Sequence, residues 1–221
     1  QHCDIRRHKR LAEHTGAHVH IAHVASKGAI DIIRQYKAKG VNVTSEVTVH
    51  HLTLTDEACA TYNPATRVSP PLRSWDHVQA MREAVLDGTV DAIVTDHAPH
   101  APEEKDVEFR YAPCGFCGLE TSLGVMLTDL YHTNIFDLKT IISKMSCEPS
   151  KLFKLERGTL AEGAVADITI MDLNKEWTVD SSKFYTRGKF TPYEGKECKG
   201  KAVATMLAGK FVMRDGVVCA K

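Results

Sequence analysis

The sequence predicts an α/β fold whose first part is a parallel sheet with crossover helices, followed by a smaller all-β part. Two observations support this. Strand and helix patterns alternate through the first part of the chain, and from residue 158 onward the pattern is of β type only. Strands that alternate with helices form parallel sheets. We therefore expect a barrel-like α/β domain over residues 1–156 and a small β domain over residues 157–221.

The first part reads as an ordered series of helices and strands. A helix over residues 4–14 is stopped by Thr15-Gly16, and a helix over residues 27–39 is ended by Gly40. Ser74 precedes a third helix. The predicted segments, in chain order, are helix 4–14, strand 18–24, helix 27–39, strand 41–47, helix 75–86 and strand 90–96.

Alternation along strand 18–24 assigns its side chains to two faces. Val19, Ile21 and His23 share one face, which we expect to line the interior of a barrel. His20 lies on the other face and is expected to be a hydrogen-bonded core histidine against the helices.

The alternation of strands and helices stops after residue 96, where a long loop over residues 97–118 carries charges, Pro and Gly. Long loops without secondary structure are often functional. Asp215-Gly216 predicts a hairpin turn before the last strand. The remaining predicted segments are helices 119–132, 136–145 and 149–153, and strands 165–171, 202–208, 211–212 and 217–218.

Composition narrows the classes of protein. The chain has 221 residues, of which 43% are hydrophobic and 25% charged, enough for a sizeable core in a soluble protein. Lys plus Arg and Asp plus Glu both number 28, which gives no electrostatic case for binding nucleic acid or a membrane. No apolar run approaches the roughly 20 residues of a membrane span.

The seven cysteines are odd in number and scattered, so we expect reduced thiols and a cytoplasmic protein. Cys114 and Cys117 form one close pair, for which an ordinary loop pair is favoured over a metal or redox site. The first residue is not Met, and a predicted helix is already under way near it. We therefore expect the chain to be part of a longer protein.

The segment Val94-Thr95-Asp96-His97-Ala98-Pro99-His100 carries the strongest chemical signal. Asp96 ends a short β-branched strand, and α/β barrels keep their catalytic groups at the carboxyl ends of strands. The alternative is that Asp96 only caps a turn. His23 ends another predicted strand in the same way. Because imidazole and carboxylate are ligands that suit Zn²⁺, the pair predicts a metal site at the barrel mouth.

Several motifs together resemble those of the dihydroorotases of the amidohydrolase superfamily. The resemblance covers nearly the whole chain, and Thr95-Asp96-His97-Ala98-Pro99-His100 is its most specific motif. Hydantoinases and allantoinases share the histidine and aspartate at the strand ends but generally follow the aspartate with other residues. The other matching motifs lie at residues 20–26, 46–52, 69–73, 115–121 and 163–167.

The resemblance implies strands six to eight and trailing helices of a TIM-type (β/α)8 barrel, followed by part of a small β-sandwich. It also implies a dihydroorotase, which interconverts N-carbamoyl-L-aspartate and (S)-dihydroorotate in de novo pyrimidine (UMP) biosynthesis. His23 and Asp96 would bind one or two zinc ions, and Asp96 would also shuttle the catalytic proton. Zinc activates water, and a neighbouring carboxylate can relay its proton.

The resemblance also assigns the substrate contacts. His100 would bind the substrate carboxylate, and the backbone of Cys114 and Gly115 would contact the ring. Cys114 stands where many relatives carry Phe or Pro, which a backbone contact tolerates. Ser69 stands where relatives usually carry Asn, and this departure leaves the exact substrate open. His50 and His51 are expected to be structural, because the family gives neither to the metal.

Two other functions stay open. One is a hydantoinase or dihydropyrimidinase, and the other is a catalytically silent, dihydroorotase-like scaffold for aspartate carbamoyltransferase. A small-molecule substrate and a homo-oligomer are expected. Relatives also use metal ligands on strands one, four and five, which nothing in this sequence supplies. We therefore expect the 221-residue chain alone neither to hold zinc tightly nor to turn over.

Overall fold

The computed structural model describes residues 2–219, with the side chains of residues 5–8 and 10–219, and falls into two compact units. The first unit runs to Glu120 and also includes Asp180–Glu194. The second comprises Thr121–Val179 and the chain from Gly195 onward. The units thus divide the chain at residues 120, 179 and 194. The domain boundary near residue 156 stays a prediction.

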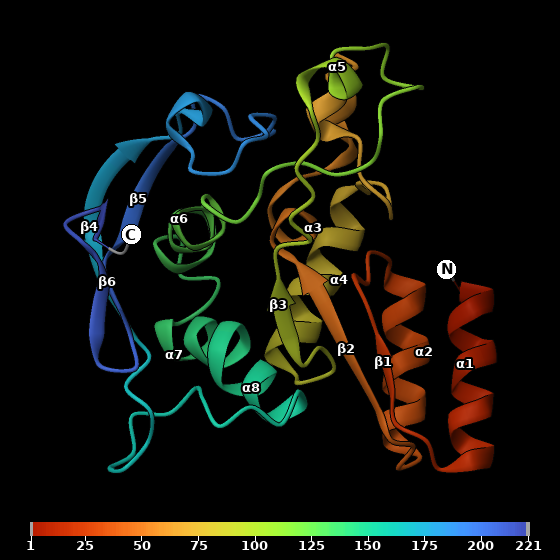
Figure 1. Ribbon diagram of the computed structural model, residues 1–221. Coiled ribbons are helices and arrows are strands. Elements are labelled where there is room, and N and C mark those ends of the chain that lie inside the picture. The colour runs from red at the N-terminus through yellow and green to blue at the C-terminus, as the bar shows by residue number, and fades with distance from the viewer. Residues whose placement is uncertain (1, 220–221) are drawn as a thin grey trace. The chain divides into compact units, whose positions relative to one another are not determined.

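The centre of the first unit is a parallel sheet, as the alternating pattern predicts. Its strands are β1 (Val19–Ile21), β2 (Val43–Thr48) and β3 (Ala92–Val94), in the order β1-β2-β3. Val19 pairs with Val43, and Glu46 pairs with Ala92. Figure 1 shows the three strands side by side, each followed by a segment that leaves from the same edge.

Helices connect the strands of the first unit and cover the sheet. α2 and α4 supply apolar side chains, including Ile30, Ile33, Met81 and Val85, that are almost completely buried, as is Val47 of β2. This core holds the strands in place. The helices are α1 (His2–Thr15), α2 (Lys27–Ala38), α3 (Val49–Thr53), α4 (Trp75–Leu86) and α5 (Pro102–Lys105), with 3-10 turns at Asp56–Cys59, Pro64–Thr66 and Ser181–Lys183.

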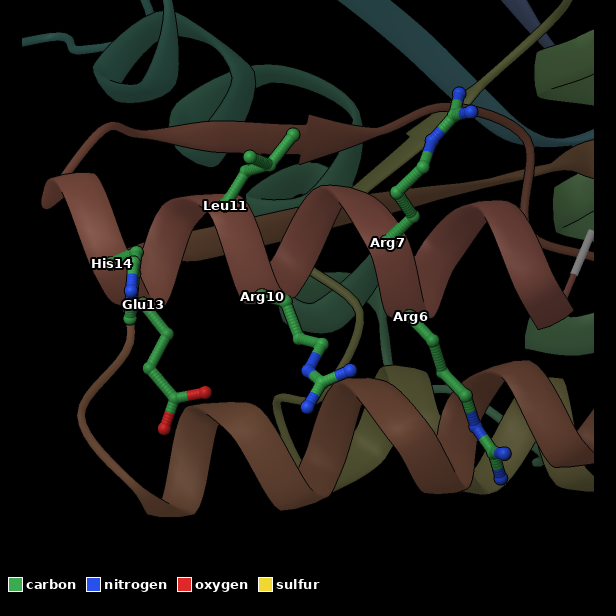
Figure 2. Close-up of a pocket in the computed structure, with 6 residues that line it drawn as sticks. All are labelled: Arg6, Arg7, Arg10, Leu11, Glu13 and His14. Atoms are coloured by element: carbon green, nitrogen blue, oxygen red, sulfur yellow. The ribbon is translucent and has the colours of Figure 1, made fainter.

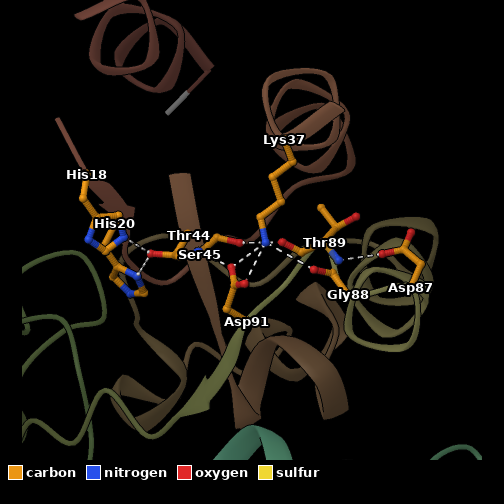
Figure 3. A network of polar contacts seen from close by, with 9 residues as sticks. All are labelled: His18, His20, Lys37, Thr44, Ser45, Asp87, Gly88, Thr89 and Asp91. Carbon is orange, nitrogen blue, oxygen red and sulfur yellow. Dashed lines mark hydrogen bonds and ion pairs between the residues drawn. The ribbon is translucent and has the colours of Figure 1, made fainter. Parts of the chain in front are cut away.

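A polar network joins the sheet to α2 near the beginning of β3. Asp91 accepts two hydrogen bonds of 2.7 Å from Lys37 Nζ and one of 2.8 Å from the Ser45 N–H. The Ser45 hydroxyl donates to the Thr89 carbonyl at 3.0 Å. Figure 3 shows Lys37 reaching down from its helix to this carboxylate. The network therefore connects α2, β2 and the segment before β3 through one charge pair.

The network also shows which face of the sheet the helices cover. Ser45 is buried on the α2 side, so Thr44 and Glu46 point to the opposite face by alternation. His20 hydrogen-bonds both, at 2.8 Å and 3.0 Å. The prediction that His20 faces the helices is therefore wrong. The expectation that Val19 and Ile21 line the interior of the barrel is wrong for the same reason: the apolar side chains of β1 turn to the helix layer, and His20 joins polar groups on the other face.

The second unit combines a helical segment with an antiparallel sheet. α6 (Ser122–Met126) continues into a π-helical turn (Leu127–Tyr131), and α7 (Leu138–Ile142), a second π turn (Ser143–Cys147) and α8 (Glu148–Leu152) follow one another directly. The predicted helices 136–145 and 149–153 are therefore one continuous run. The strands are β4 (Ile168–Thr178), β5 (Glu197–Leu207), β6 (Lys210–Arg214) and β7 (Val217–Val218), in that order.

Two features of the β region can be compared with the sequence. Asp215 and Gly216 have φ values of 50° and 79° between the antiparallel strands β6 and β7, which confirms the predicted hairpin turn. The described residues of this unit form one four-stranded sheet, and the β-sandwich stays a prediction.

Within residues 2–219, no helix combines the length and the apolar character that crossing a membrane requires.

Replacing Asp91 should weaken the first unit. In Asp91→Ala the Ser45 N–H and the Lys37 ammonium lose a shared acceptor, so we expect the free energy of unfolding to fall by about 1–3 kcal/mol. Chemical denaturation measures it. The control is Asp31→Ala, which removes an exposed carboxylate paired with Arg34 and should cost less than about 1 kcal/mol. Equal losses would contradict a structural role for the network.

Candidate functional site

His23 and Asp96 occupy equivalent places on two strands of the parallel sheet. β1 ends at Ile21 and β3 at Val94, so each residue is the second after its strand. Their φ values are 39° and 50°, in the left-handed region that non-glycine residues rarely adopt. Strained backbone of this kind clusters at functional sites. Both residues leave the same edge of the sheet, and their convergence on one ion stays a prediction.

Two histidines at the end of β2 belong to the same edge. His50 and His51 lie in the first turn of α3 and are buried, with 1% and 3% of their surface exposed. Burial, and then the neighbouring His51 and His23, hold the pKa of His50 well below its ordinary value. His23 also lowers the pKa of His51. The three imidazoles therefore interact electrostatically, a grouping that the sequence analysis missed although the His-His pair directly after a strand was a visible signal.

His51 joins this strand end to the loop that carries Ser69. Its Nε2 donates to the Pro70 carbonyl at 3.1 Å, so its Nδ1 accepts from the Thr48 hydroxyl at 2.7 Å. Burial lowers the pKa of His51 from 6.5 to about 4, although the bond to Pro70 works in the opposite direction. His51 is therefore a neutral bridge at physiological pH. Ser69 itself is exposed next to it.

His50 has a different environment, because neither of its ring nitrogens has a hydrogen-bond partner among the described residues. Its ring lies 4.4 Å from that of His51 and 5.1 Å from that of Phe116, centroid to centroid. A buried polar group without a partner costs free energy, so its presence here calls for a structural or functional reason. The Phe116 contact brings the long loop after β3 against this strand end.

The loop after β3 folds back on itself and gathers the predicted substrate residues. The Ala98 N–H donates to the Phe116 carbonyl at 3.0 Å, next to a bridge between His97 and Phe116. The Leu119 N–H donates to His97 Nδ1 at 3.1 Å. These hydrogen bonds close the loop into a compact double layer, in which residues 97–100 lie against residues 114–119.

His100, Cys114 and Gly115 meet in this layer. His100 Nε2 donates to the Cys114 carbonyl at 3.0 Å, and the Gly115 N–H donates to the Arg67 carbonyl at 2.8 Å. Arg67 is two residues from Ser69, so all four predicted substrate residues belong to one loop cluster. Gly115 is required here, because its φ is +112° and a Cβ would lie 2.4 Å from the Ala98 Cβ.

A segment from much later in the chain packs against this loop. The Cys117 N–H donates to the Phe190 carbonyl at 2.8 Å, and Glu120 accepts from the Tyr185 and Thr186 N–H groups at 2.9 Å and 3.0 Å. Gly188 is so close that a Cβ would lie 3.0 Å from the Pro99 Cβ. Residues 180–194 therefore belong structurally to the loop that follows Asp96, which no local sequence pattern could reveal.

One surface depression lies away from these residues. It has a volume of about 880 Å³ and is lined by residues of α1 alone: Arg6, Arg7, Arg10, Leu11, Glu13 and His14. Figure 2 shows these side chains along one helix. The residues at the strand ends are not among them, so the depression is separate from the candidate site. The six cysteines whose side chains are described, including Cys114 and Cys117, are free thiols.

Comparison with known proteins places the chain in a family. The model of the family described as "Amidohydrolase family" matches residues 4–212. The chain belongs to the amidohydrolase family. Its α/β fold is accordingly an amidohydrolase fold.

The most similar curated relatives of this amidohydrolase include dihydroorotases. That of Syntrophus aciditrophicus (strain SB) is 50% identical over 205 residues, which are 93% of this chain and 48% of the relative. That of Pelotomaculum thermopropionicum is 48% identical over 208 residues, 94% of this chain and 49% of the relative. The chain therefore spans about half the length of the curated relatives that it matches.

Solved structures also match this chain over about half of their own length. An L-hydantoinase (dihydropyrimidinase) from Arthrobacter aurescens matches with a TM-score of 0.94 and 31% identity, over 98% of this chain and 49% of that one. A D-hydantoinase (dihydropyrimidinase) from Thermus sp. matches with a TM-score of 0.87 and 26% identity, over 98% and 49%. The two groups of relatives act on different cyclic amides by name, so they leave the choice of substrate open.

The stability of the first unit should depend on pH through His51. Its pKa is about 4 when folded, below the ordinary 6.5, so the unfolded chain binds the proton more readily. Stability is therefore complete above pH 6.5 and is lost as the pH falls towards 4, by up to roughly 3 kcal/mol for this group. His51→Gln should flatten the dependence, measured by denaturation at several pH values. His14→Gln, at an exposed position on α1, controls for loss of a surface imidazole; an unchanged slope in His51→Gln would contradict the prediction.

Gly115→Ala should displace the substrate loop. The new Cβ would collide with Ala98, and the layer could relax only by separating Ala98 from Phe116. We expect the Ala98 amide proton to exchange with solvent at least about tenfold faster. Gly88→Ala is the matched control, because Gly88 also has a positive φ of 80° but no atom within 4 Å of its Cβ position. Equal exchange at Ala98 in both variants would show that the close approach is unimportant.

Proposed function

We propose that this chain forms part of a zinc-dependent dihydroorotase, which interconverts N-carbamoyl-L-aspartate and (S)-dihydroorotate in de novo pyrimidine biosynthesis. The observation that carries the proposal is the equivalent placing of His23 and Asp96, each two residues beyond a parallel strand and each with a left-handed backbone. Sequence identity of 50% over 205 residues to a curated dihydroorotase supports the choice of reaction. Active sites of α/β barrels lie at this edge of the strands.

The donor set of the chain can be compared with the needs of zinc. Catalytic zinc has three protein ligands and one open position. The described residues contain no group of three or more His, Cys, Asp or Glu side chains arranged to hold a metal. His23 and Asp96 provide one imidazole and one carboxylate, both suitable donor types, in alternate strands of the sheet. In the proposal they bind one or two zinc ions together with ligands from outside the described residues.

Each proposed residue has a defined chemical task. Bound zinc would supply a water of lowered pKa and would polarise the amide carbonyl. Asp96 takes a proton from the attacking water and delivers it to the departing ring nitrogen. His100 binds the substrate carboxylate, while the backbone of Cys114 and Gly115 holds the ring and Ser69 contacts it from the neighbouring loop.

The protein groups proposed to bind the substrate already have hydrogen-bond partners within the loop cluster. His100 Nε2–H donates to the Cys114 carbonyl, and the Gly115 N–H donates to the Arg67 carbonyl. A carboxylate is a stronger acceptor than a neutral carbonyl, so it can take over the His100 hydrogen bond on binding. In this proposal the Cys114 carbonyl keeps the imidazole oriented until substrate arrives.

A second candidate is a hydantoinase or dihydropyrimidinase, favoured by the TM-score of 0.94 to a solved L-hydantoinase and by Ser69 in place of the usual Asn. The third is a silent scaffold for aspartate carbamoyltransferase. Retention of His23 and Asp96 argues against it, because a silent protein needs neither. The working protein is proposed to be a cytoplasmic homo-oligomer.

Assays with dihydroorotate, hydantoin and dihydrouracil test the proposal. A form of the protein with the complete donor set should prefer dihydroorotate, and the 221-residue chain alone should neither retain zinc on dialysis nor turn over. Asp96→Asn should lower kcat by roughly 10²–10⁴ without changing zinc content to the same degree. Asp106→Asn, at an exposed position in the same loop, is the control. Turnover by the isolated chain, or preference for hydantoin, would refute the proposal.

A further inference from the structure

Lys105 is a completely buried lysine that the proposed reaction does not use. It is the last residue of α5 and has 0% of its surface exposed. Its ammonium donates to the Pro64 carbonyl and to the Pro113 carbonyl, both at 2.8 Å. A buried lysine is costly unless its charge is compensated, so its presence under this loop calls for a physical reason.

The two carbonyl partners lie on the two sides of the substrate loop cluster. Pro113 directly precedes Cys114, and Pro64 opens the turn that leads to Arg67, whose carbonyl accepts from Gly115. The ammonium and the Gly115–Arg67 hydrogen bond are thus two links between the same two segments. Removing the ammonium would leave the second link to hold them together.

Planarity of the peptide bond makes the contact directional. The Pro113 carbonyl and the Cys114 N–H belong to one planar trans peptide unit, in which they point in opposite directions. A hydrogen bond from Lys105 to the carbonyl therefore fixes where the Cys114 N–H points. The next carbonyl, that of Cys114, accepts from His100. Lys105 thereby influences both groups proposed to contact the substrate.

The beginning of α5 completes the arrangement. The Ala101 N–H donates to Glu104 at 3.1 Å, and the same carboxylate oxygen lies 3.7 Å from His100 Nδ1. His100 lies two residues before the start of α5, and Lys105 is the last residue of that helix. Burial lowers the pKa of Lys105 from 10.5 to about 8, which leaves the ammonium charged near neutral pH.

We propose that Lys105 is a positioning residue, whose buried ammonium orients the Pro113–Cys114 peptide and His100 for the carboxylate of a cyclic-amide substrate. The inference rests on the proposed function for the identity of the ligand. Its structural half, the orientation of the loop by Lys105, can be tested without turnover.

Hydrogen exchange of the 221-residue chain tests the structural half. In Lys105→Met, the Gly115 amide should exchange at least about tenfold faster, while amides of β2 keep their rates. Lys105→Arg, which retains a charged donor, should restore much of the protection. Lys151→Met is the control, because Lys151 is an exposed lysine with an acidic partner three residues away. An unchanged Gly115 rate, or an equal acceleration in β2, overturns the proposal.

If Lys105→Met does not fold, Lys105→Gln replaces it. The shorter neutral amide cannot supply the charge and can reach at most part of the arrangement, so Gly115 exchange should still rise. Unchanged exchange in a folded Lys105→Gln protein would again overturn the proposal.

Kinetics test the link to the substrate in a form of the protein that turns over. Lys105→Met should raise KM for dihydroorotate about tenfold with kcat within about twofold, and should raise KM for dihydrouracil, which has the ring but lacks the carboxylate, by a clearly smaller factor. Equal effects on both substrates would indicate a merely structural role and overturn the proposal. If the unaltered protein turns over no cyclic amide, the proposed function fails, while the exchange experiment still decides the role of Lys105.

Discussion

Parallel pairing of β1, β2 and β3 is the constraint on which the rest of the first unit depends. Because the strands run in one direction, the segments that follow them all leave from one edge of the sheet. This brings His23, the His50-His51 pair and the loop after Asp96 to the same end of the unit. The Asp91 carboxylate strengthens the pairing, since it binds the backbone of β2 and the ammonium of Lys37 in α2. Site geometry and sheet stability are therefore physically connected.

The loops at this edge are organised by backbone hydrogen bonds and by a few buried polar side chains. His51 connects Thr48 to Pro70, and Lys105 connects Pro64 to Pro113. Each bridge joins a carbonyl of an irregular segment, which lacks the internal hydrogen bonds of a helix or strand, to a donor from elsewhere. Burial lowers the pKa of both side chains, so the unit loses some stability to order these loops.

The candidate site has two chemically distinct parts. Metal-type donors, His23 and Asp96, follow strands directly, where the rigid sheet limits their movement. The proposed substrate contacts, among them His100 and Gly115, lie in a loop that is held by other loops. Rigid placement suits ligands of an ion, which tolerates little error in distance, and an adjustable loop suits recognition of a substrate that must enter and leave.

The sequence alone determined the local features of this protein. Alternating helix and strand patterns predicted the strands and crossover helices of the parallel sheet, and Asp215-Gly216 predicted the hairpin turn, because the pattern of each element depends on residues close together in the chain. Motifs at the strand ends identified His23 and Asp96 as candidates, and family membership agrees with the resemblance on which their roles rest.

Only the tertiary structure decided which face of β1 meets the helices, since alternation defines two faces without saying which one is covered. It also decided that His50 and His51 interact with His23, that residues 180–194 pack against the loop after Asp96, and that Lys105 is buried between two carbonyls. These contacts join residues far apart in sequence. Their energies depend on desolvation and on hydrogen-bond partners that exist only once the chain has folded.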